Sequence, residues 1–216
     1  MKKALITGAS RGIGRAIAED LGKDHHIYAG ASKDASDVVA ALPSAEPFEV
    51  DLTDTDAILE AASKIEELDV LVLAAGVLHK GPFEELTDEQ WRESMAVNLL
   101  APVALTRAVL PALRRSSGLI IAINSGAGFH GVADNTAYCA SKFALRGFTE
   151  ALQEEEAGRL RVTSLHPGRT DTDMLAGDDG RPKMDAAEVA KAARLAVDAG
   201  PDAVVEFLRV RPARTS

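Results

Sequence analysis

Near its amino terminus the chain reads Lys3-Ala4-Leu5-Ile6-Thr7-Gly8-Ala9-Ser10-Arg11-Gly12-Ile13-Gly14. The apolar run up to Thr7 predicts a strand, and the spacing of Ile17 and Leu21 predicts a helix directly after the glycines. A glycine-rich turn that opens a helix lets backbone N–H groups and the positive helix end meet a pyrophosphate. The spacing Gly-x-x-x-Gly-x-Gly differs from the commoner Gly-x-Gly-x-x-Gly. The stretch therefore predicts a dinucleotide-binding turn, with a purely structural role of the glycines as the alternative.

Strand and helix patterns alternate through the rest of the chain. After the first strand, further strands are expected at residues 26–31, 47–52, 69–75, 118–125, 161–166 and 204–211. Helical patterns cover residues 15–22, 53–65, 87–115 and about 135–155, and another helix starts near residue 185. Such alternation is typical of an α/β domain with a parallel sheet.

Composition limits the function classes. A chain of 216 residues with 46% hydrophobic residues can bury a full core, and no linker divides it, so one domain over residues 1–216 is expected. The formal net charge of -9 argues against nucleic acid and anionic membranes as partners. The only cysteine, Cys139, fits a reducing compartment, and no apolar run has the length of a membrane span, so a cytoplasmic protein is expected. The histidines lack metal-ligand spacing, which predicts no metal site.

The residues at the end of the second strand indicate whether the chain would bind NAD or NADP. An acidic residue there would bind the ribose 2′-hydroxyl of NAD, whereas hydroxyl or basic groups accommodate the 2′-phosphate of NADP. The chain has Ser32 and Lys33 at this point, with no acid before Asp34. Together with Arg11 in the glycine turn, they favour NADP(H). NAD(H) remains possible through Asp34, and Lys33 could simply be solvated.

Several chemically useful residues follow strands that should end at one edge of the sheet. Asp51, Gly76 and Ser125 each come at the carboxyl end of a predicted strand, as Gly8 does. Open α/β sheets bind their ligands at this edge. Each residue alone could serve only its turn, but together they predict a site.

Two helices supply the remaining candidates. Thr87 to Gln90 has the form of a capping box, and Pro102 lies four residues after Asn98, so a kink with a freed Asn98 carbonyl that could hold water is expected. On the later helix, which Asp134 or Asn135 could cap, Tyr138 and Lys142 are one turn apart on the same face. A nearby cation stabilises a phenolate and lowers its pKa, which suits acid–base chemistry. Both features, taken singly, could instead arise from packing or chance.

With these residues in order, the chain resembles the short-chain dehydrogenase/reductase family nearly end to end. The likeness is carried by Thr7-Gly8-x-x-x-Gly12-x-Gly14, Asp51-Leu52, Ala75-Gly76, Asn98, Ser125, Tyr138-x-x-x-Lys142 and Pro167-Gly168-x-x-x-Thr172. The resemblance implies a doubly wound Rossmann fold of about seven parallel strands with helices on both faces. It also implies an NADP(H)-dependent oxidoreductase that transfers a hydride between the cofactor and a small carbonyl or alcohol substrate.

The resemblance assigns roles to residues. Tyr138 is the expected proton donor or acceptor, Ser125 binds the substrate oxygen, Lys142 lowers the tyrosine pKa and binds the nicotinamide ribose, and Asn98 holds a water. Thr172 is expected at the nicotinamide carboxamide. Relatives pair through the helices that carry Asn98 and Tyr138, so a homodimer or homotetramer is expected. The cofactor-binding set consists of Gly8, Ser10, Arg11, Gly12, Ile13, Gly14, Ser32, Lys33, Asp51, Leu52, Ala75, Gly76, Tyr138, Lys142, Pro167, Gly168, Thr170 and Thr172.

Two features depart from the family pattern. Where relatives commonly read Asn-Asn-Ala-Gly, this chain has Leu73-Ala74-Ala75-Gly76, which leaves open how this strand is tied to its surroundings. The segment that forms a lid in relatives is short here, about residues 173–184, which predicts an open or mobile mouth. Candidate wall residues, which select no substrate class, are Leu78, Phe129, His130, Arg169, Met174 and Leu175. His166, next to Pro167, is expected to be structural rather than catalytic.

Two other functions remain possible at this stage. Sugar-nucleotide epimerases and dehydratases also use Tyr-x-x-x-Lys but usually need a longer carboxyl-terminal substrate domain. A non-enzymatic NADP(H)-binding regulator would have little reason to keep the asparagine, serine, tyrosine and lysine together. The substrate and the physiological direction do not follow from the sequence.

Overall fold

The computed structural model describes residues 1–175, 180–200 and 202–213. A seven-stranded sheet forms its centre, and all strand pairs are parallel, in the order β3-β2-β1-β4-β5-β6-β7. The strands are β1 (Lys2–Thr7), β2 (His25–Ala31), β3 (Ala45–Glu49), β4 (Val70–Leu73), β5 (Leu119–Ile123), β6 (Arg161–Pro167) and β7 (Phe207–Val210). The order reverses direction between β1 and β4, which is the crevice where such sheets bind dinucleotides. The predicted doubly wound Rossmann fold is confirmed.

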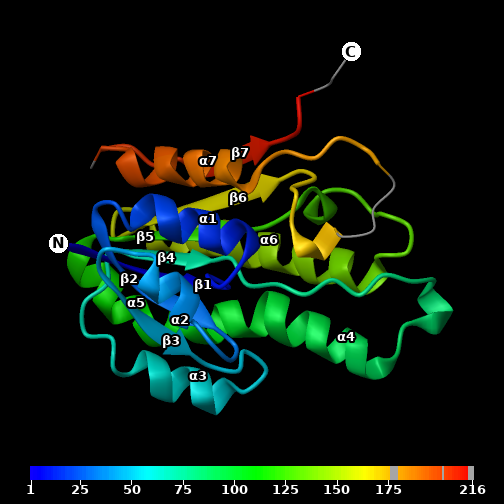
Figure 1. Ribbon diagram of the computed structural model, residues 1–216, viewed down its shortest axis with the longest axis horizontal. Coiled ribbons are helices and arrows are strands. Elements are labelled where there is room, and N and C mark those ends of the chain that lie inside the picture. Colours follow the sequence, from blue (N-terminus) through cyan, green and yellow to red (C-terminus); the bar gives the residue numbers. More distant parts are fainter. Residues whose placement is uncertain (176–179, 201, 214–216) are drawn as a thin grey trace.

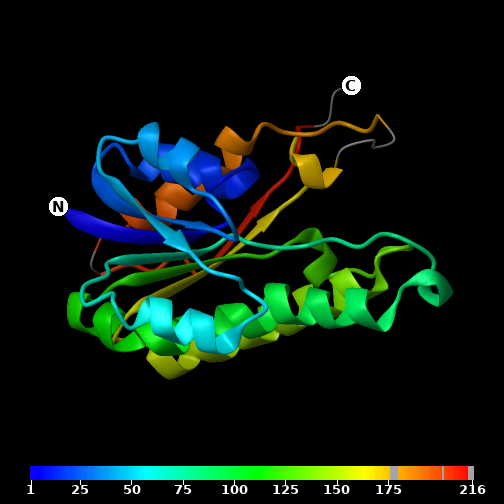
Figure 2. The ribbon, with the colours of Figure 1, turned by 60° about the horizontal axis from the view of Figure 1, so that its bottom comes forward.

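Helices cover both faces of the sheet (Figures 1 and 2). On one face lie α1 (Gly12–Leu21), α2 (Ser36–Ala40) and α7 (Ala186–Asp198), whose apolar residues form one buried cluster with alternate strand residues. The other face carries α3 (Thr55–Ala62), α4 (Asp88–Met95), α5 (Ala101–Ser116) and α6 (Thr136–Glu156). The central strand β4 is buried along its whole length, because both faces are covered.

Some expected boundaries were wrong. The third strand ends at Glu49 rather than near residue 52, so Asp51 follows the strand by two residues. Helix α2 has five residues and shows no helical period long enough to be predicted from the sequence. Asn135 is the N-cap of α6, but its side chain makes no cap hydrogen bond, and Nδ2 donates to Ala133 O at 2.7 Å instead. Asp134, the other candidate cap, has a positive φ of 59°.

The kink expected at Pro102 takes the form of a π-helical turn. Residues Ala96–Leu100 form this turn between α4 and α5, and the N–H of Ala101 donates to the Ala96 carbonyl. A proline cannot donate to the carbonyl four residues earlier, and the wider turn accommodates this loss. The predicted capping box at the start of α4 is confirmed, with Thr87 and Gln90 bonded reciprocally.

The three helical segments join into one helix, Asp88–Ser116, that is long and apolar enough by length and composition to cross a membrane. This finding differs from the expectation that no run reaches such a length. In the fold, 56% of its most apolar window is buried, and α5 packs Ala104, Leu105 and Leu113 into the core below the sheet. The segment is therefore a core helix in this structure.

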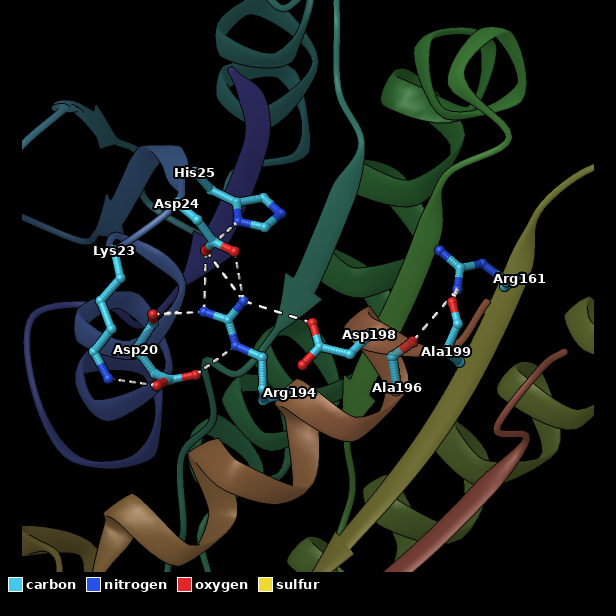
Figure 3. A network of polar contacts seen from close by, with 9 residues as sticks. All are labelled: Asp20, Lys23, Asp24, His25, Arg161, Arg194, Ala196, Asp198 and Ala199. Carbon is cyan, nitrogen blue, oxygen red and sulfur yellow. Dashed lines mark hydrogen bonds and ion pairs between the residues drawn. The ribbon is translucent and has the colours of Figure 1, made fainter. Parts of the chain in front are cut away.

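Arg194 joins the last helix to the first (Figure 3). From α7 its Nε donates to Asp20 Oδ2 at 2.8 Å and its Nη2 to the Asp20 carbonyl at 2.6 Å. Nη1 and Nη2 reach both carboxylate oxygens of Asp24, at 2.9 and 3.1 Å. Hydrogen bonding to Arg194 lowers the pKa of Asp24 to about 2. Because α1 carries the glycine turn at its amino end, this contact helps to hold the turn in place.

Replacing Arg194 by methionine keeps an apolar stem but removes the guanidinium that Asp20 and Asp24 share, so Asp20 keeps only its exposed partner Lys23. We expect the free energy of unfolding to fall by about 1–3 kcal/mol, because the guanidinium is only partly exposed. Chemical denaturation measures this change. Lys191→Met on the same helix is the control: its exposed pair with Glu188 should leave the melting temperature nearly unchanged. An equal loss in both variants would contradict a specific clamp.

Candidate active site

Two glycines of the turn between β1 and α1, Gly8 and Gly14, have no room for a side chain. A Cβ on Gly8 would lie 2.9 Å from Ala75 Cα, and one on Gly14 would lie 2.2 Å from Gly8 O. Gly8 and Gly12 have φ values of 68° and 57°, which favour glycine. At the start of α1, Arg11 makes no side-chain cap and the first turn holds no acidic residue. Among the described residues, no side chain accepts from the N–H groups of this turn, which fits the pyrophosphate of a dinucleotide.

The loop after β6 closes on this turn. A Cβ on Gly12 would lie 3.2 Å from Thr172 Cγ2, so the glycine turn and the Pro167–Thr172 region meet. Gly168 N donates to Val210 O at 2.6 Å, and Thr170 Oγ1 donates to Gly168 O at 3.1 Å. Exposed Ser10 and half-buried Ile13 lie in the glycine turn itself. This part of the predicted cofactor set therefore comes together at one edge of the sheet.

The residues predicted to contact the ribose of the dinucleotide lie at the surface. Ser32 and Lys33 are exposed just beyond β2. Asp34 accepts hydrogen bonds from the backbone N–H of Ser36, at 2.8 Å, and from its hydroxyl. Asp34 is thus engaged in the turn that starts α2.

The second acidic candidate is engaged in a similar way. Asp51 is exposed, and its Oδ1 accepts from both Thr53 N and Thr53 Oγ1 at 2.8 Å. These bonds lower the pKa of Asp51. Leu52 beside it is half-buried against the core. The side chain of Asp51 is thus already bonded within its own turn.

Thr7 ties the end of β1 to the strand that lacks the family's asparagines. Its buried Oγ1 accepts from Ala74 N at 3.0 Å and from Ala75 N at 3.1 Å. One threonine hydroxyl therefore satisfies two backbone donors, and no amide side chain is needed at residues 73 and 74 for these bonds. It also brings Ala75 against Gly8 in the crevice.

Asn98 is fully buried, and both ends of its amide are bonded. Oδ1 accepts from Val77 N at 2.9 Å, while Nδ2 donates to Val77 O and to Ser141 Oγ, both at 3.0 Å. Gly76 permits this approach, because a Cβ there would lie 3.2 Å from Asn98 Oδ1 and 3.9 Å from Lys142 Nζ. The side chain thus joins the loop after β4 to helix α6.

Ser125, Tyr138 and Lys142 lie around the same loop. Lys142 is buried, its Nζ donates to Ile123 O at 2.9 Å, and it lies 5.7 Å from the centroid of the Tyr138 ring. Ser125 follows the end of β5 by two residues and is the N-cap of the 3-10 turn Gly126–Gly128. Together with Asn98, these three residues make up the predicted catalytic set, and all four are therefore neighbours in the fold.

Burial shifts the pKa values of two residues of this set, Lys142 and Tyr138. Burial lowers the pKa of Lys142 to about 8. Burial raises the pKa of Tyr138 above its usual 10.0, and the neighbouring Ser125 hydroxyl opposes this shift. The expected lowering of the tyrosine pKa by Lys142 is not found, because burial dominates and the ammonium faces a carbonyl. The phenol is accordingly neutral near pH 7 in this arrangement.

The lid segment lies over the same loop at its described start. Asp173–Leu175 forms a 3-10 turn, and the Met174 methyl would be 4.0 Å from a Cβ on Gly76. At the other end, Met184 N donates to Arg169 O at 2.9 Å. Residues 176–179 lie outside the described residues, so the expected open mouth stays a prediction. Met174, a predicted wall residue, thus lies near Gly76, and the wall role of Leu175 stays a prediction.

Sequence patterns missed three polar contacts of the site. Asn124 Oδ1 accepts from Ser125 N at 2.9 Å, Ser141 accepts from Asn98, and His166 Nδ1 contacts Ser125 O at 3.1 Å. Ser141 lies inside Tyr138-x-x-x-Lys142, but its role depends on where Asn98 comes to lie. Phe129, a predicted wall residue, instead packs on His166 with ring centroids 4.5 Å apart.

One pocket lies away from this crevice. A pocket of about 640 Å³ opens at the amino ends of the strands, beside Asp69, Gly118 and Arg161. Arg161 is engaged there with the carbonyls of Ala196 and Ala199, the latter at 2.9 Å (Figure 3). None of the predicted site residues lines this pocket, so it does not compete with the crevice as the site. Within the described residues, no group of three or more His, Cys, Asp and Glu side chains could hold a metal ion.

Fold and site together define an oxidoreductase of the Rossmann type. Residues 2–181 match the short chain dehydrogenase family, and the chain belongs to the short-chain dehydrogenase/reductase family. It is 35% identical to an uncharacterized oxidoreductase of Staphylococcus saprophyticus, over 98% of this chain and 97% of that protein. It is 34% identical to the 3-oxoacyl-[acyl-carrier-protein] reductase of Haemophilus influenzae, over 80% of this chain and 76% of the other.

Solved structures agree with this assignment. An alcohol dehydrogenase from Thermococcus sibiricus, complexed with 5-hydroxy-NADP, has a TM-score of 0.89 and 29% identity, covering 100% of this chain and 99% of the other. A metagenomic short-chain oxidoreductase in complex with NADP has a TM-score of 0.85 and 33% identity, covering 99% and 98%. The similarity therefore extends over the whole fold.

Replacing Thr7 by valine keeps the shape of the side chain but removes the acceptor for two backbone N–H groups. We expect a loss of about 1–3 kcal/mol in the free energy of unfolding, because both donors are then left unsatisfied. Urea denaturation measures this loss. Thr7→Ser keeps the hydroxyl and is the control, with a smaller loss. Equal stability of the valine variant and the wild type would contradict this role.

Proposed function

We propose that the protein is an NADP(H)-dependent oxidoreductase that transfers a hydride between the nicotinamide cofactor and a small carbonyl or alcohol substrate. The observation that carries this proposal is the meeting of Asn98, Ser125, Tyr138 and Lys142 beside the crevice into which the glycine turn opens. A proton donor, a hydrogen-bonding hydroxyl and a buried cation are the groups that reduction of a carbonyl requires from the protein.

Each residue of this set has a part in the proposed reaction. The bound nicotinamide supplies the hydride chemistry, and the protein supplies position and the proton. Tyr138 donates the proton to the substrate oxygen in reduction and accepts it in oxidation. Ser125 hydrogen-bonds the same oxygen and stabilises the charge that develops on it. Lys142 supports the phenolate that remains, and Asn98 holds the loop after β4 against α6.

Burial bears on the direction of the reaction. Because the pKa of Tyr138 is raised, the phenol starts neutral at physiological pH and is ready to donate a proton. Lys142, with a pKa of about 8, is mostly charged below that pH. Both states suit reduction, in which the tyrosine gives up its proton beside a cation.

The preference for NADP(H) is supported by three observations. Arg11, Ser32 and Lys33 are exposed and can meet a 2′-phosphate. The carboxylate of Asp34, which would favour NAD(H), is bonded to Ser36. Two of the similar solved structures carry NADP or a hydroxylated NADP.

Assembly and location belong to the proposal as well. Leu100 and Phe143, on the helices that carry Asn98 and Tyr138, are 55% and 45% exposed. Exposed large apolar side chains on these two helices fit a homodimer or homotetramer formed through them. The free, buried Cys139 fits a reducing compartment such as the cytoplasm.

Tyr138→Phe tests the reaction directly. We expect carbonyl-dependent NADPH oxidation to fall by roughly 10²–10⁴-fold, because the proton donor is lost while the ring remains. The assay uses a broad carbonyl panel and follows absorbance of NADPH. Tyr28→Phe, at the only other tyrosine, is the matched control and should keep full activity. Full activity of the Tyr138 variant would remove its role, and cofactor binding without any turnover in the wild type would favour a regulator.

Lys33→Gln tests the cofactor preference. We expect NADPH to bind roughly tenfold more weakly and NADH to bind unchanged, because only the phosphate contact is lost. Fluorescence titration of both cofactors measures the two dissociation constants. Lys64→Gln, an exposed lysine after α3, is the control and should change neither. Tighter binding of NADH than NADPH to the wild type would indicate that Asp34 binds the ribose 2′-hydroxyl instead.

A further inference from the structure

Ser125 is held mostly by residues of its own turn. Its N–H donates to Asn124 Oδ1 at 2.9 Å, its Oγ accepts from Ala127 N at 3.1 Å, and its carbonyl accepts from Gly128 N at 3.1 Å. These three bonds fix the shape of the turn. They do not hold Ser125 itself against β6, and the backbone bond to that strand is one residue earlier, from Asn124 N to Leu165 O at 2.7 Å.

One contact to Ser125 comes from a different strand. His166, 1% exposed and next to the last residue of β6, places Nδ1 3.1 Å from the carbonyl oxygen of Ser125. Its Nε2 lies 2.8 Å from Ser164 Oγ on the same strand. A carbonyl only accepts hydrogen bonds, so Nδ1 must carry the proton of a neutral ring, and Nε2 then accepts from the Ser164 hydroxyl. Burial lowers the pKa of His166 to about 4, so the ring is neutral near pH 7.

Aromatic packing holds the ring of His166 in this orientation. Phe129 lies 4.5 Å from it and Phe207 4.7 Å, between ring centroids. Arg146 covers Phe129, with its guanidinium carbon 4.1 Å from the ring centroid. Ser125 caps the 3-10 turn, and Phe129 directly follows it. The ring of His166 therefore contacts this turn at both of its ends.

We infer that His166 is a positioning residue for Ser125. Its Nδ1–H bond to the Ser125 carbonyl fixes the turn after β5 against β6, and this sets the distance from the Ser125 hydroxyl to the substrate oxygen. His166 does not contact the reacting atoms itself, since both of its nitrogens are engaged within the protein. The inference rests on the proposed function, in which Ser125 stabilises the reacting oxygen.

Two substitutions of His166 separate the hydrogen bond from the packing. His166→Phe keeps an aromatic ring and removes the donor, whereas His166→Asn keeps an amide N–H in reach of the carbonyl. We expect the phenylalanine variant to lose about 10–100-fold in kcat with a cofactor KM within twofold of the wild type, because a displaced catalytic group slows the reaction. We expect the asparagine variant to recover most of the rate. Wild-type kcat in the phenylalanine variant, or no recovery with asparagine, would overturn the inference.

His25→Phe is the matched control. His25 is the other deeply buried histidine and bonds Asp24 through Nδ1 at 2.8 Å, at the start of β2. Its replacement should lower the melting temperature without changing kcat. A parallel loss of kcat there would show that any buried histidine affects the rate through stability, and would overturn a specific role of His166.

A second measurement needs no variant and no turnover. Nitrogen-15 NMR of the wild-type histidine rings distinguishes the two neutral tautomers, and His166 is expected to carry its proton on Nδ1 near pH 7. A proton on Nε2 would overturn the inference even in an active enzyme. A wild type that turns over no carbonyl would remove the proposed function alone, while the Nδ1–H tautomer would still support the contact that holds Ser125.

Discussion

The contact on which the site depends is the close approach of two backbones at the point where the strand order reverses. Gly8 lies against Ala75 with no space for a Cβ, and Thr7 holds this approach by accepting hydrogen bonds from Ala74 and Ala75. The carboxyl ends of β1 and β4 are thereby brought together, and the crevice between them opens toward the amino end of α1. Any side chain at Gly8 would separate the two strand ends and move the glycine turn away from the residues of α6.

The electrostatics of the site follow from the depth at which α6 is buried. Burial disfavours the charged forms of both Tyr138 and Lys142, so it raises the first pKa and lowers the second. The Ile123 carbonyl partly replaces the water that the ammonium of Lys142 has lost. A site of this kind keeps a proton available on the phenol and holds a cation nearby for the moment at which the phenolate forms. The raised tyrosine pKa is consistent with this role, because a donor must hold its proton until the substrate oxygen needs it.

Sequence patterns were sufficient for the sheet but not for the contacts between its parts. Continuous apolar runs such as 69–75 and 118–125 are typical of strands covered on both faces, and the fold confirms β4 and β5 within them. Helix α2 was missed because five residues do not span enough turns to show a period. The water expected at the backbone carbonyl of Asn98 stays a prediction, but the bonds of its side chain to Val77 and Ser141 were not expected. That pairing joins residues more than 20 positions apart, and no local pattern in one sequence specifies it.

The contact between His166 and Ser125 is likewise not specified by any local pattern in the sequence. His166 was judged structural because it stands beside a proline at a strand end, and a single residue of this kind carries no information about its partner. The register of β5 and β6 pairs Ile123 with Leu165, and Asn124 N still donates to Leu165 O at 2.7 Å, so the turn at Ser125 begins beside His166. A donor on one strand end then meets a carbonyl just past the other. Positioning of a catalytic turn can thus come from strand register, which is a property of the whole sheet, and the residue that transmits it need not resemble a catalytic residue in the sequence.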